Sequence, residues 1–208
     1  MTIENVVNAL KDLFIVRRDC YPLQIEHKNE YIVVKENLTY KIISDHLKGL
    51  ITIGCWQVDP LSKTVKWVCF DFDGVIEEEF EKAKKLFYKL KNKGLNPLME
   101  FSGRRGYHIW LFVEPIDLID ARKFAIDVSR TQSPHEIFPK NDKLTGKGYG
   151  FQVKLPLGIH RVPMKRSFLF DENLRPLSHE KSQDFLIKLS RKKRDTISSK
   201  NLISFVGS

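Results

Sequence analysis

Cysteine is scarce in this chain of 208 residues, and the few cysteines are too widely spaced for their usual structural roles. They are Cys20, Cys55 and Cys69, an odd number with no Cys-x-x-Cys pair. A disulfide framework needs an even set and a structural zinc site needs closely spaced ligands, so cysteine alone supplies neither. This pattern favours a reducing compartment, and we expect a cytoplasmic protein.

Long apolar runs are also missing. No segment approaches the roughly 18 consecutive apolar residues that suggest a membrane-spanning helix. The first residues, MTIENVVNALKDLF, carry acidic and amide side chains where a secretory signal has a basic start followed by an apolar block. We therefore expect neither secretion nor a membrane partner.

Acidic residues are fewer than basic ones. Lys plus Arg number 35 against 26 Asp plus Glu, which gives a formal net charge of +9. The 42% of hydrophobic residues is typical of a globular chain, and the length is sufficient for a core without disulfides. The positive charge favours a polyanionic partner such as nucleic acid or a nucleotide.

Apolar periodicity in the first third predicts a small α/β module. Residues 2–14 and 39–48 have apolar side chains at helical spacing, and residues 31–34 and 50–58 have the composition of strands. We place this N-terminal module at residues 1–62.

The remainder, residues 63–208, begins with a regular succession of strands and helices. The predicted elements are a strand at 66–73, a helix at 77–93, strands at 97–102 and 107–113, a helix that Asp117 caps, and a strand at 135–138. This β-α-β-β-α-β order is that of ferredoxin-like and RNA-recognition folds. Further strands at 151–156 and 166–170 and a helix at 179–192 follow.

The expected fold is therefore α+β, with the N-terminal α/β module packed on an RNA-recognition-like sheet as one compact domain. Right-handed crossovers place the first and third strands of the sheet in the middle and the fourth beside the first. This topology predicts that residues 71, 73, 108 and 136 are neighbours.

The first informative motif is Phe70-Asp71-Phe72-Asp73 at the end of a predicted strand. Residues i and i+2 of a strand face the same side, so the two carboxylates lie roughly 7 Å apart. Oxygen ligands of this kind favour Mg²⁺ or Mn²⁺. The alternative is a pair of exposed acids in a turn.

A second motif runs from Ser102 through Gly103-Arg104-Arg105-Gly106 to His108. Guanidinium groups and glycine-exposed backbone N–H groups suit a triphosphate, and histidine can donate to a phosphate oxygen. The alternative for His108 is a half-buried structural histidine.

Two later segments add candidate side chains. Glu136 lies on the predicted fourth strand and can complete a three-carboxylate set for two cations, with Asp142 as the competing acid. Lys154, His160 and Arg161 stand among apolar residues. They neutralise phosphates or a template backbone, or else they are ordinary basic residues at a sheet edge.

Taken together, these residues resemble the catalytic core of the archaeo-eukaryotic primase superfamily, the primase-polymerases. The family's paired aspartates correspond to Asp71 and Asp73, its Ser-turn-His motif to Ser102 through His108, and its later acid to Glu136. The sequence is most similar to primase domains of CRISPR-associated primase-polymerases and of TOTE conflict systems. Short sequence motifs of those primase domains recur in this chain at residues 19–21, 46–49, 136–140 and 154–161.

The resemblance implies a template-dependent nucleotidyltransferase, a DNA primase or polymerase, that joins nucleoside triphosphates with two Mg²⁺ or Mn²⁺ ions. It implies that Asp71, Asp73 and Glu136 hold the ions and that His108 belongs to the catalytic set. The triphosphate is assigned to Ser102, Arg104, His108, Lys154, His160 and Arg161, and the template to Arg105 and Lys140. The implied partners are a single-stranded or primed DNA or RNA template, nucleoside triphosphates, and CRISPR or other defence or replication proteins.

Two other classes of protein share parts of these motifs. A phosphatase of the haloacid dehalogenase type would use Asp71 as nucleophile and Asp73 as acid, but no later Gly-Asp-x-x-x-Asp pair is present. A non-catalytic RNA-recognition module would use residues 105–112 for stacking. Its stacking position falls on His108, however, and the first strand presents two carboxylates that repel a phosphate backbone.

Overall fold

The computed structural model of the protein describes residues 2–144 and 148–195. These residues form two compact units, and each unit draws on separated stretches of the chain. The first unit contains residues 2–57, 100–104 and 152–192, and the second contains 58–99, 105–144, 148–151 and 193–195. Residues 152–192, which we had predicted together with the sheet, thus belong to the same unit as the N-terminal segment.

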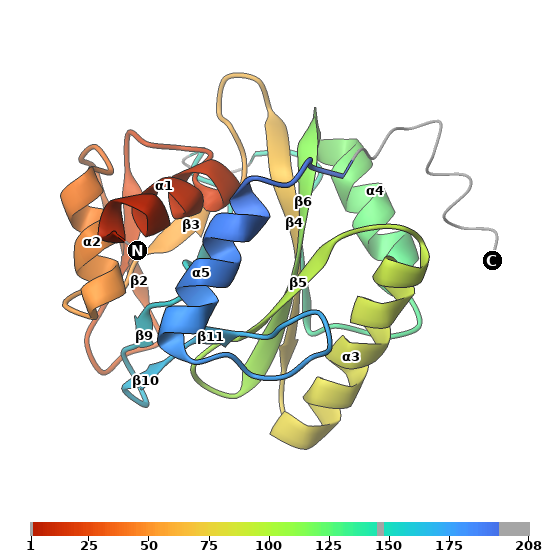
Figure 1. The fold of residues 1–208 in the computed structure, drawn as a ribbon. Helices are drawn as coiled ribbons and strands as arrows, with labels where there is room; N and C mark the ends of the chain where they lie inside the picture. The colour runs from red at the N-terminus through yellow and green to blue at the C-terminus, as the bar shows by residue number, and fades with distance from the viewer. Residues whose placement is uncertain (1, 145–147, 196–208) are drawn as a thin grey trace. The chain divides into compact units, whose positions relative to one another are not determined.

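The first unit combines helices with short antiparallel strand pairs. Its elements are α1 (Ile3–Phe14), β1 (Tyr21–Gln24), β2 (Tyr31–Val34), α2 (Tyr40–Lys48), β3 (Gly54–Trp56), β8 (Gln152–Lys154), β9 (Ile159–His160), β10 (Lys165–Arg166), β11 (Phe168–Leu169) and α5 (His179–Ser190). The pairs are β1 with β2, β3 with β8, and β9 with β10. Helices α1 and α5 lie side by side (Figure 1).

Local sequence explains the helices of this unit. The apolar stripe of α1 is buried at Val6, Leu10 and Phe14, as its periodicity predicted. Helix α2 begins where the Thr39 hydroxyl accepts a hydrogen bond from the Ile42 N–H, and it ends at Gly49, whose φ of 81° is left-handed.

The second unit has the predicted β-α-β-β-α-β order. Its elements are β4 (Thr64–Asp73), α3 (Ile76–Asn92), β5 (Pro97–Phe101), β6 (Gly106–Asp117), α4 (Leu118–Ser129) and β7 (Glu136–Phe138). Glu100 and Phe101, the last residues of β5, belong to the first unit and pair there with β11. The strand order β5-β6-β4-β7 confirms the predicted topology.

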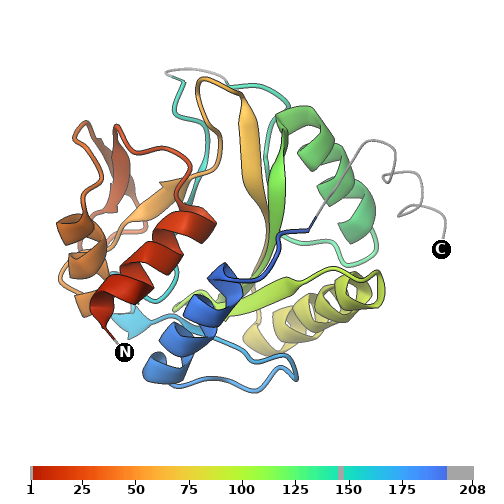
Figure 2. The same cartoon turned by 45° about the horizontal axis from the view of Figure 1, so that its top comes forward.

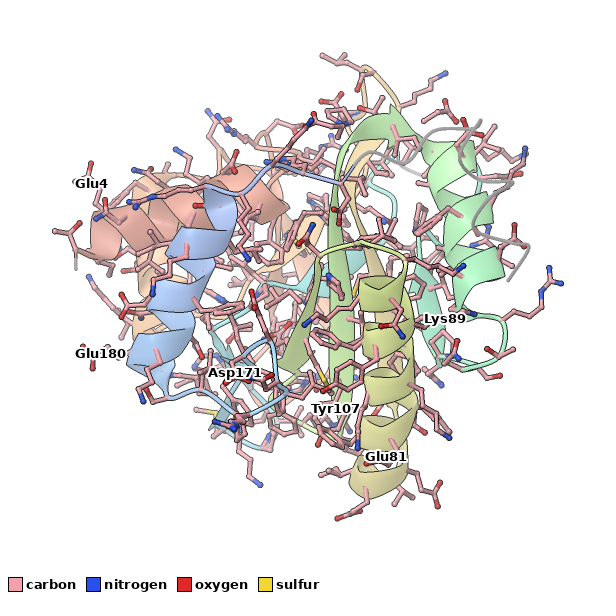
Figure 3. All side chains as sticks on the ribbon, turned by 45° about the vertical axis from the view of Figure 1, so that its right-hand side comes forward. Glu4, Glu81, Lys89, Tyr107, Asp171 and Glu180 are labelled. Carbon is pink, nitrogen blue, oxygen red and sulfur yellow. The ribbon has the colours of Figure 1, made fainter. Side chains whose placement is uncertain are left out.

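Aromatic side chains pack on both faces of this sheet. Helices α3 and α4 lie on the same side of β4 and β6 (Figures 1 and 2). Tyr107 marks the helix side, because its ring meets Phe80 of α3 edge-on at 5.4 Å between centroids, and Figure 3 shows it beside that helix. The opposite side carries Trp67 and Trp110, which are fully buried with ring centroids 5.1 Å apart.

Both helices of the second unit follow from their sequence. Helix α3 has three glutamates in its first turn, and Lys89 and Lys91 in its last, which complements the helix dipole. Helix α4 begins where the Asp117 carboxylate accepts a hydrogen bond from the Ile119 N–H at 2.8 Å, as predicted. Throughout the described residues, no helix combines the length and the apolar character needed to cross a membrane.

Candidate active site

The strand register of the second unit brings the acidic motifs together. Asp71 on β4 lies directly opposite His108 on β6 and, on its other side, directly opposite Glu136 on β7. Directly opposed residues of antiparallel strands project from the same face, and Asp73 shares that face because it is two residues from Asp71. The four neighbours predicted from topology are therefore neighbours in the structure.

The environment of Asp71 is crowded with charge. Its Oδ1 lies 3.6 Å from Nε2 of His108, and only 21% of the Asp71 side chain is exposed. Burial raises the pKa of Asp71; His108 opposes this rise, and the nearby carboxylates of Asp73 and Glu136 add to it. A cation placed among these carboxylates would relieve both the repulsion and the cost of burial.

Two basic side chains already neutralise part of the acidic cluster. Arg105 donates two hydrogen bonds to the Asp73 carboxylate, at 3.1 and 3.0 Å, and the Lys140 ammonium contacts Glu136. Within the described residues, no group of three or more His, Cys, Asp or Glu side chains is arranged to ligate a metal ion. The donors nonetheless fit Mg²⁺ or Mn²⁺ in chemistry, since carboxylates that share one face are the ligands such ions take.

The two candidates for the third acid lie in different places. Glu136 is the first residue of β7 and is in register with Asp71. Asp142 lies beyond that strand, in an exposed bend. Of these two acids, Glu136 is the one in register with Asp71, and its role as the third acid stays a prediction.

The turn between β5 and β6 is divided between the two units, and its first part packs within the first unit. Gly103 has a φ of 91°, and a Cβ there would lie 2.9 Å from the Lys165 carbonyl oxygen and 3.3 Å from the His160 Cβ. The Ser102 hydroxyl accepts a hydrogen bond from the Arg104 N–H at 3.4 Å. The structure thus brings the Ser102–Arg104 turn against His160, which lies 58 positions after Ser102 in the sequence.

The predicted triphosphate ligands of the first unit have extensive protein contacts. The buried Lys154 ammonium donates to the Ser167 hydroxyl at 3.0 Å and to the Leu155 carbonyl at 3.1 Å, and it lies 3.5 Å from the Glu100 carboxylate. Burial lowers the pKa of Lys154, which Glu100 partly counteracts. Its contribution to triphosphate binding stays a prediction.

His160 and Arg161 are buried in the same way. The Arg161 guanidinium donates to the Thr52 hydroxyl and to the Gly49 carbonyl oxygen, each at 2.8 Å. The His160 Nδ1 accepts from the Val162 N–H at 3.2 Å. These contacts fix both side chains within the first unit, and their binding of a triphosphate remains a prediction.

Sequence reasoning assigned no role to His46, which supports this segment. Its Nδ1 accepts from the Ile53 N–H at 3.1 Å, so its Nε2 carries the proton and donates to the Pro156 carbonyl oxygen at 3.1 Å. Burial, with a smaller effect of Lys154, lowers the pKa of His46 to about 3. The available signal was the recurrence of the segments 46–49 and 154–161 in the resembling family, which gives no role for either.

A sequence model of a known protein family matches most of this chain. The archaeo-eukaryotic primase domain of the TOTE conflict system matches residues 5–200 of the chain. The chain belongs to this family. The sequence resemblance to archaeo-eukaryotic primases is thereby confirmed, while a CRISPR association stays a prediction. Among curated proteins, none matches this primase-family chain.

Solved structures are similar to this primase-family domain at low sequence identity. The polymerase domain of Mycobacterium tuberculosis Ligase D, solved in complex with DNA, is 12% identical with a TM-score of 0.50, covering 88% of this chain and 85% of that one. The primase-polymerase domain of cyanophage S-2L is 11% identical with a TM-score of 0.49, covering 89% and 98%. The catalytic domain of primase RepB′ is 8% identical with a TM-score of 0.43, covering 89% and 93%. The α+β architecture of this chain is thus shared with the polymerase domain of Ligase D.

Proposed function

We propose that this primase-family chain is a template-dependent nucleotidyltransferase that extends a nucleic-acid strand with nucleoside triphosphates. One observation carries the proposal: the register of β6, β4 and β7 sets His108, Asp71 and Glu136 in one row across three strands, with Asp73 on the same face. Residues from three separated motifs thus form one acidic cluster. These are the three motifs that correspond to those of the primase family.

Divalent ions are part of the proposal. Asp71, Asp73 and Glu136 would hold Mg²⁺ or Mn²⁺, which when bound activates a 3′-hydroxyl and stabilises negative charge on the departing pyrophosphate. Arg105 and Lys140 neutralise two of these carboxylates in the structure. Once cations take that place, both side chains are available to phosphates of a template or primer.

His108 has a separate role in this proposal. Its ring is held edge-on to Trp110 at 5.6 Å between centroids, and it is 6% exposed. A histidine held in this way keeps a fixed direction toward the acidic cluster, where its N–H can donate to a phosphate oxygen of the incoming nucleotide. Template pairing would select the base, so these residues need not distinguish sequence.

Nucleotide incorporation tests the proposal directly. The purified chain is incubated with labelled nucleotides, Mg²⁺ or Mn²⁺, and a primed or unprimed single-stranded template. We expect metal-dependent extension that disappears in Asp71→Asn and in Glu136→Gln. Glu114→Gln is the matched control, because Glu114 is an exposed acid on β6 outside the cluster.

A second readout does not depend on turnover. Binding of Mn²⁺, followed by electron paramagnetic resonance, should weaken in Asp71→Asn and Glu136→Gln and not in Glu114→Gln. Extension that persists in Asp71→Asn would contradict the assigned roles. Absence of incorporation with every metal, accompanied by phosphate release from small phosphoesters, would contradict the nucleotidyltransferase itself.

A further inference from the structure

A pocket of about 420 Å³ lies beside the acidic cluster, within the second unit. It is formed by α4, by β7 and by the chain on both sides of β7. The polar and aromatic side chains that line it are Arg122, His135, Glu136, Lys140, Asn141 and Phe151. Glu136 therefore lines this pocket and also lies opposite Asp71 in the sheet.

Basic groups give the pocket the chemistry of a phosphate site. Arg122 projects from α4, and its Nη1 donates to the Pro139 carbonyl oxygen at 2.7 Å, which orients the guanidinium while leaving further N–H donors on its other nitrogens. The Lys140 ammonium, which also lines the pocket, contacts the carboxylate of Glu136. Arg122 and Lys140 together outweigh the single charge of Glu136, so the lining favours an anion.

An aromatic ring stands next to these cations. Phe151 is 39% exposed, and the Lys140 ammonium lies 5.0 Å from its ring centroid and 5.0 Å from that of Phe138. A large apolar ring exposed beside basic groups combines the two interactions by which proteins hold single strands, namely base stacking and neutralisation of the phosphate backbone.

We propose that this pocket holds one nucleotide of a single-stranded nucleic acid, with its phosphate on Arg122 and Lys140 and its base stacked on Phe151. The inference deepens the proposed function and rests on it for the identity of the strand. The strand would run from the pocket to the carboxylates past Glu136, which belongs to both. A free nucleoside triphosphate offers the same two groups, a phosphate and a base, so the test must separate the two sources.

The test measures binding without turnover. An end-labelled oligodeoxythymidylate is titrated with the full chain in the presence of a chelator, and fluorescence anisotropy is recorded at several salt concentrations. We expect Phe151→Leu to weaken binding at least about fivefold, since it keeps an apolar side chain but removes the stacking surface. We expect Arg122→Gln to reduce the slope of log affinity against log salt by about 0.7, the effect of one lost phosphate contact on a single strand.

Lys123→Gln is the matched control. Lys123 is the next residue on α4, carries the same charge as Arg122, is exposed and does not line the pocket. The proposal is overturned if Arg122→Gln and Phe151→Leu bind the oligonucleotide as Lys123→Gln does. It is overturned for a strand if Phe151→Leu weakens a free nucleoside triphosphate as much as it weakens the oligonucleotide.

The incorporation assay keeps this inference separate from the proposed function. If no variant or metal supports incorporation while the oligonucleotide still depends on Arg122 and Phe151, the pocket stands and the nucleotidyltransferase proposal fails. If incorporation occurs and depends on Asp71 while the two pocket variants bind normally, the nucleotidyltransferase stands and the pocket proposal fails.

Discussion

Arg105 donates hydrogen bonds to both carboxylate oxygens of Asp73, from Nε at 3.1 Å and from Nη2 at 3.0 Å. The two residues lie at the same end of the antiparallel β4–β6 pair, because Asp73 is the last residue of β4 and Arg105 immediately precedes Gly106, the first residue of β6 and the partner of Asp73. Arg105 is largely exposed, so water competes with the pair and its net stabilisation is small. Arg105 is therefore a displaceable cation on a predicted metal ligand.

Removal of Arg105 should strengthen metal binding. In Arg105→Gln the Asp73 carboxylate loses its competing cation, and we expect Mn²⁺ affinity to rise about two- to fivefold, in keeping with the strength of an exposed ion pair. Electron paramagnetic resonance titration of Mn²⁺ measures the change. Arg130→Gln is the control, since Arg130 forms a similar exposed pair with Asp127 at 3.0 Å; equal affinities in the two variants would rule out this competition.

The ionised Asp71 carboxylate should lower the stability of the fold and yet be necessary for nucleotide incorporation. Its pKa is raised in the folded state, so its ionisation disfavours folding at pH values above its unfolded pKa, and an amide removes this cost. We expect Asp71→Asn to melt at the wild-type temperature or up to about 3 °C higher while losing incorporation at least about 100-fold. A marked fall in melting temperature, seen by circular dichroism, would show that the carboxylate is structural.

The order of strands and helices in the second unit was predictable because short stretches of sequence mark each element. Regular apolar periodicity marked its helices, and the handedness of crossovers then fixed which strands are adjacent, so the row of Asp71, His108 and Glu136 followed from the order of elements. Strand ends were less well predicted: β6 continues to Asp117, well past the predicted end at 113, because Glu114 and Pro115 interrupt the apolar pattern without interrupting the strand.

The first unit was harder because its pairings are distant in sequence. Strand β1 was missed, since its second residue is Pro22 and proline weakens a strand signal. The pairing of β3 with β8 joins Gly54 to Lys154, and no local pattern reports a contact across that separation. For the same reason the sequence could not show that Lys154 and Arg161 are buried with protein partners.

Acidification should destabilise the protein through His46. Its folded pKa of about 3 lies below the ordinary value of 6.5, so the unfolded state takes up the proton first and stability is lost as the pH falls below 6.5. Between pH 8 and pH 5 the expected loss is about 2 kcal/mol, measured by urea denaturation. His46→Gln should make stability depend less on pH. His27→Gln, at an exposed histidine, should leave the pH dependence unchanged. A pH dependence that is unchanged in His46→Gln would be incompatible with this account.

Gly158 should tolerate no side chain. A Cβ at this position would lie 2.0 Å from Cε1 of the His46 ring, which two hydrogen bonds hold in place. We expect Gly158→Ala to lower the free energy of unfolding by about 1–3 kcal/mol, the usual effect of overpacking. If the clash is responsible, the double variant with His46→Ala loses less than the sum of the single losses; strict additivity would argue against the contact.

Loss of Lys154 should destabilise the fold. Glu100 is fully buried, and Lys154→Met would remove the ammonium that lies 3.5 Å from its carboxylate. Breaking one side of a buried pair typically costs about 3–5 kcal/mol, and we expect a loss of this order in urea denaturation. Glu100→Gln combined with Lys154→Met should recover part of it, and Lys165→Met, at an exposed lysine of the same unit, should have little effect. Normal stability of Lys154→Met would assign the lysine to ligand binding alone.

The five-residue stretch 100–104 belongs to one unit while the residues on both sides of it belong to the other, and residues 152–192 return to the unit in which the chain began. No single cut of the polypeptide can release either unit whole. During synthesis on the ribosome, the N-terminal helices must wait for strand β8 and helix α5 to emerge, by which time the carboxylate-bearing sheet has been translated in full. The first unit is thus completed by residues that are translated after the sheet of the second unit.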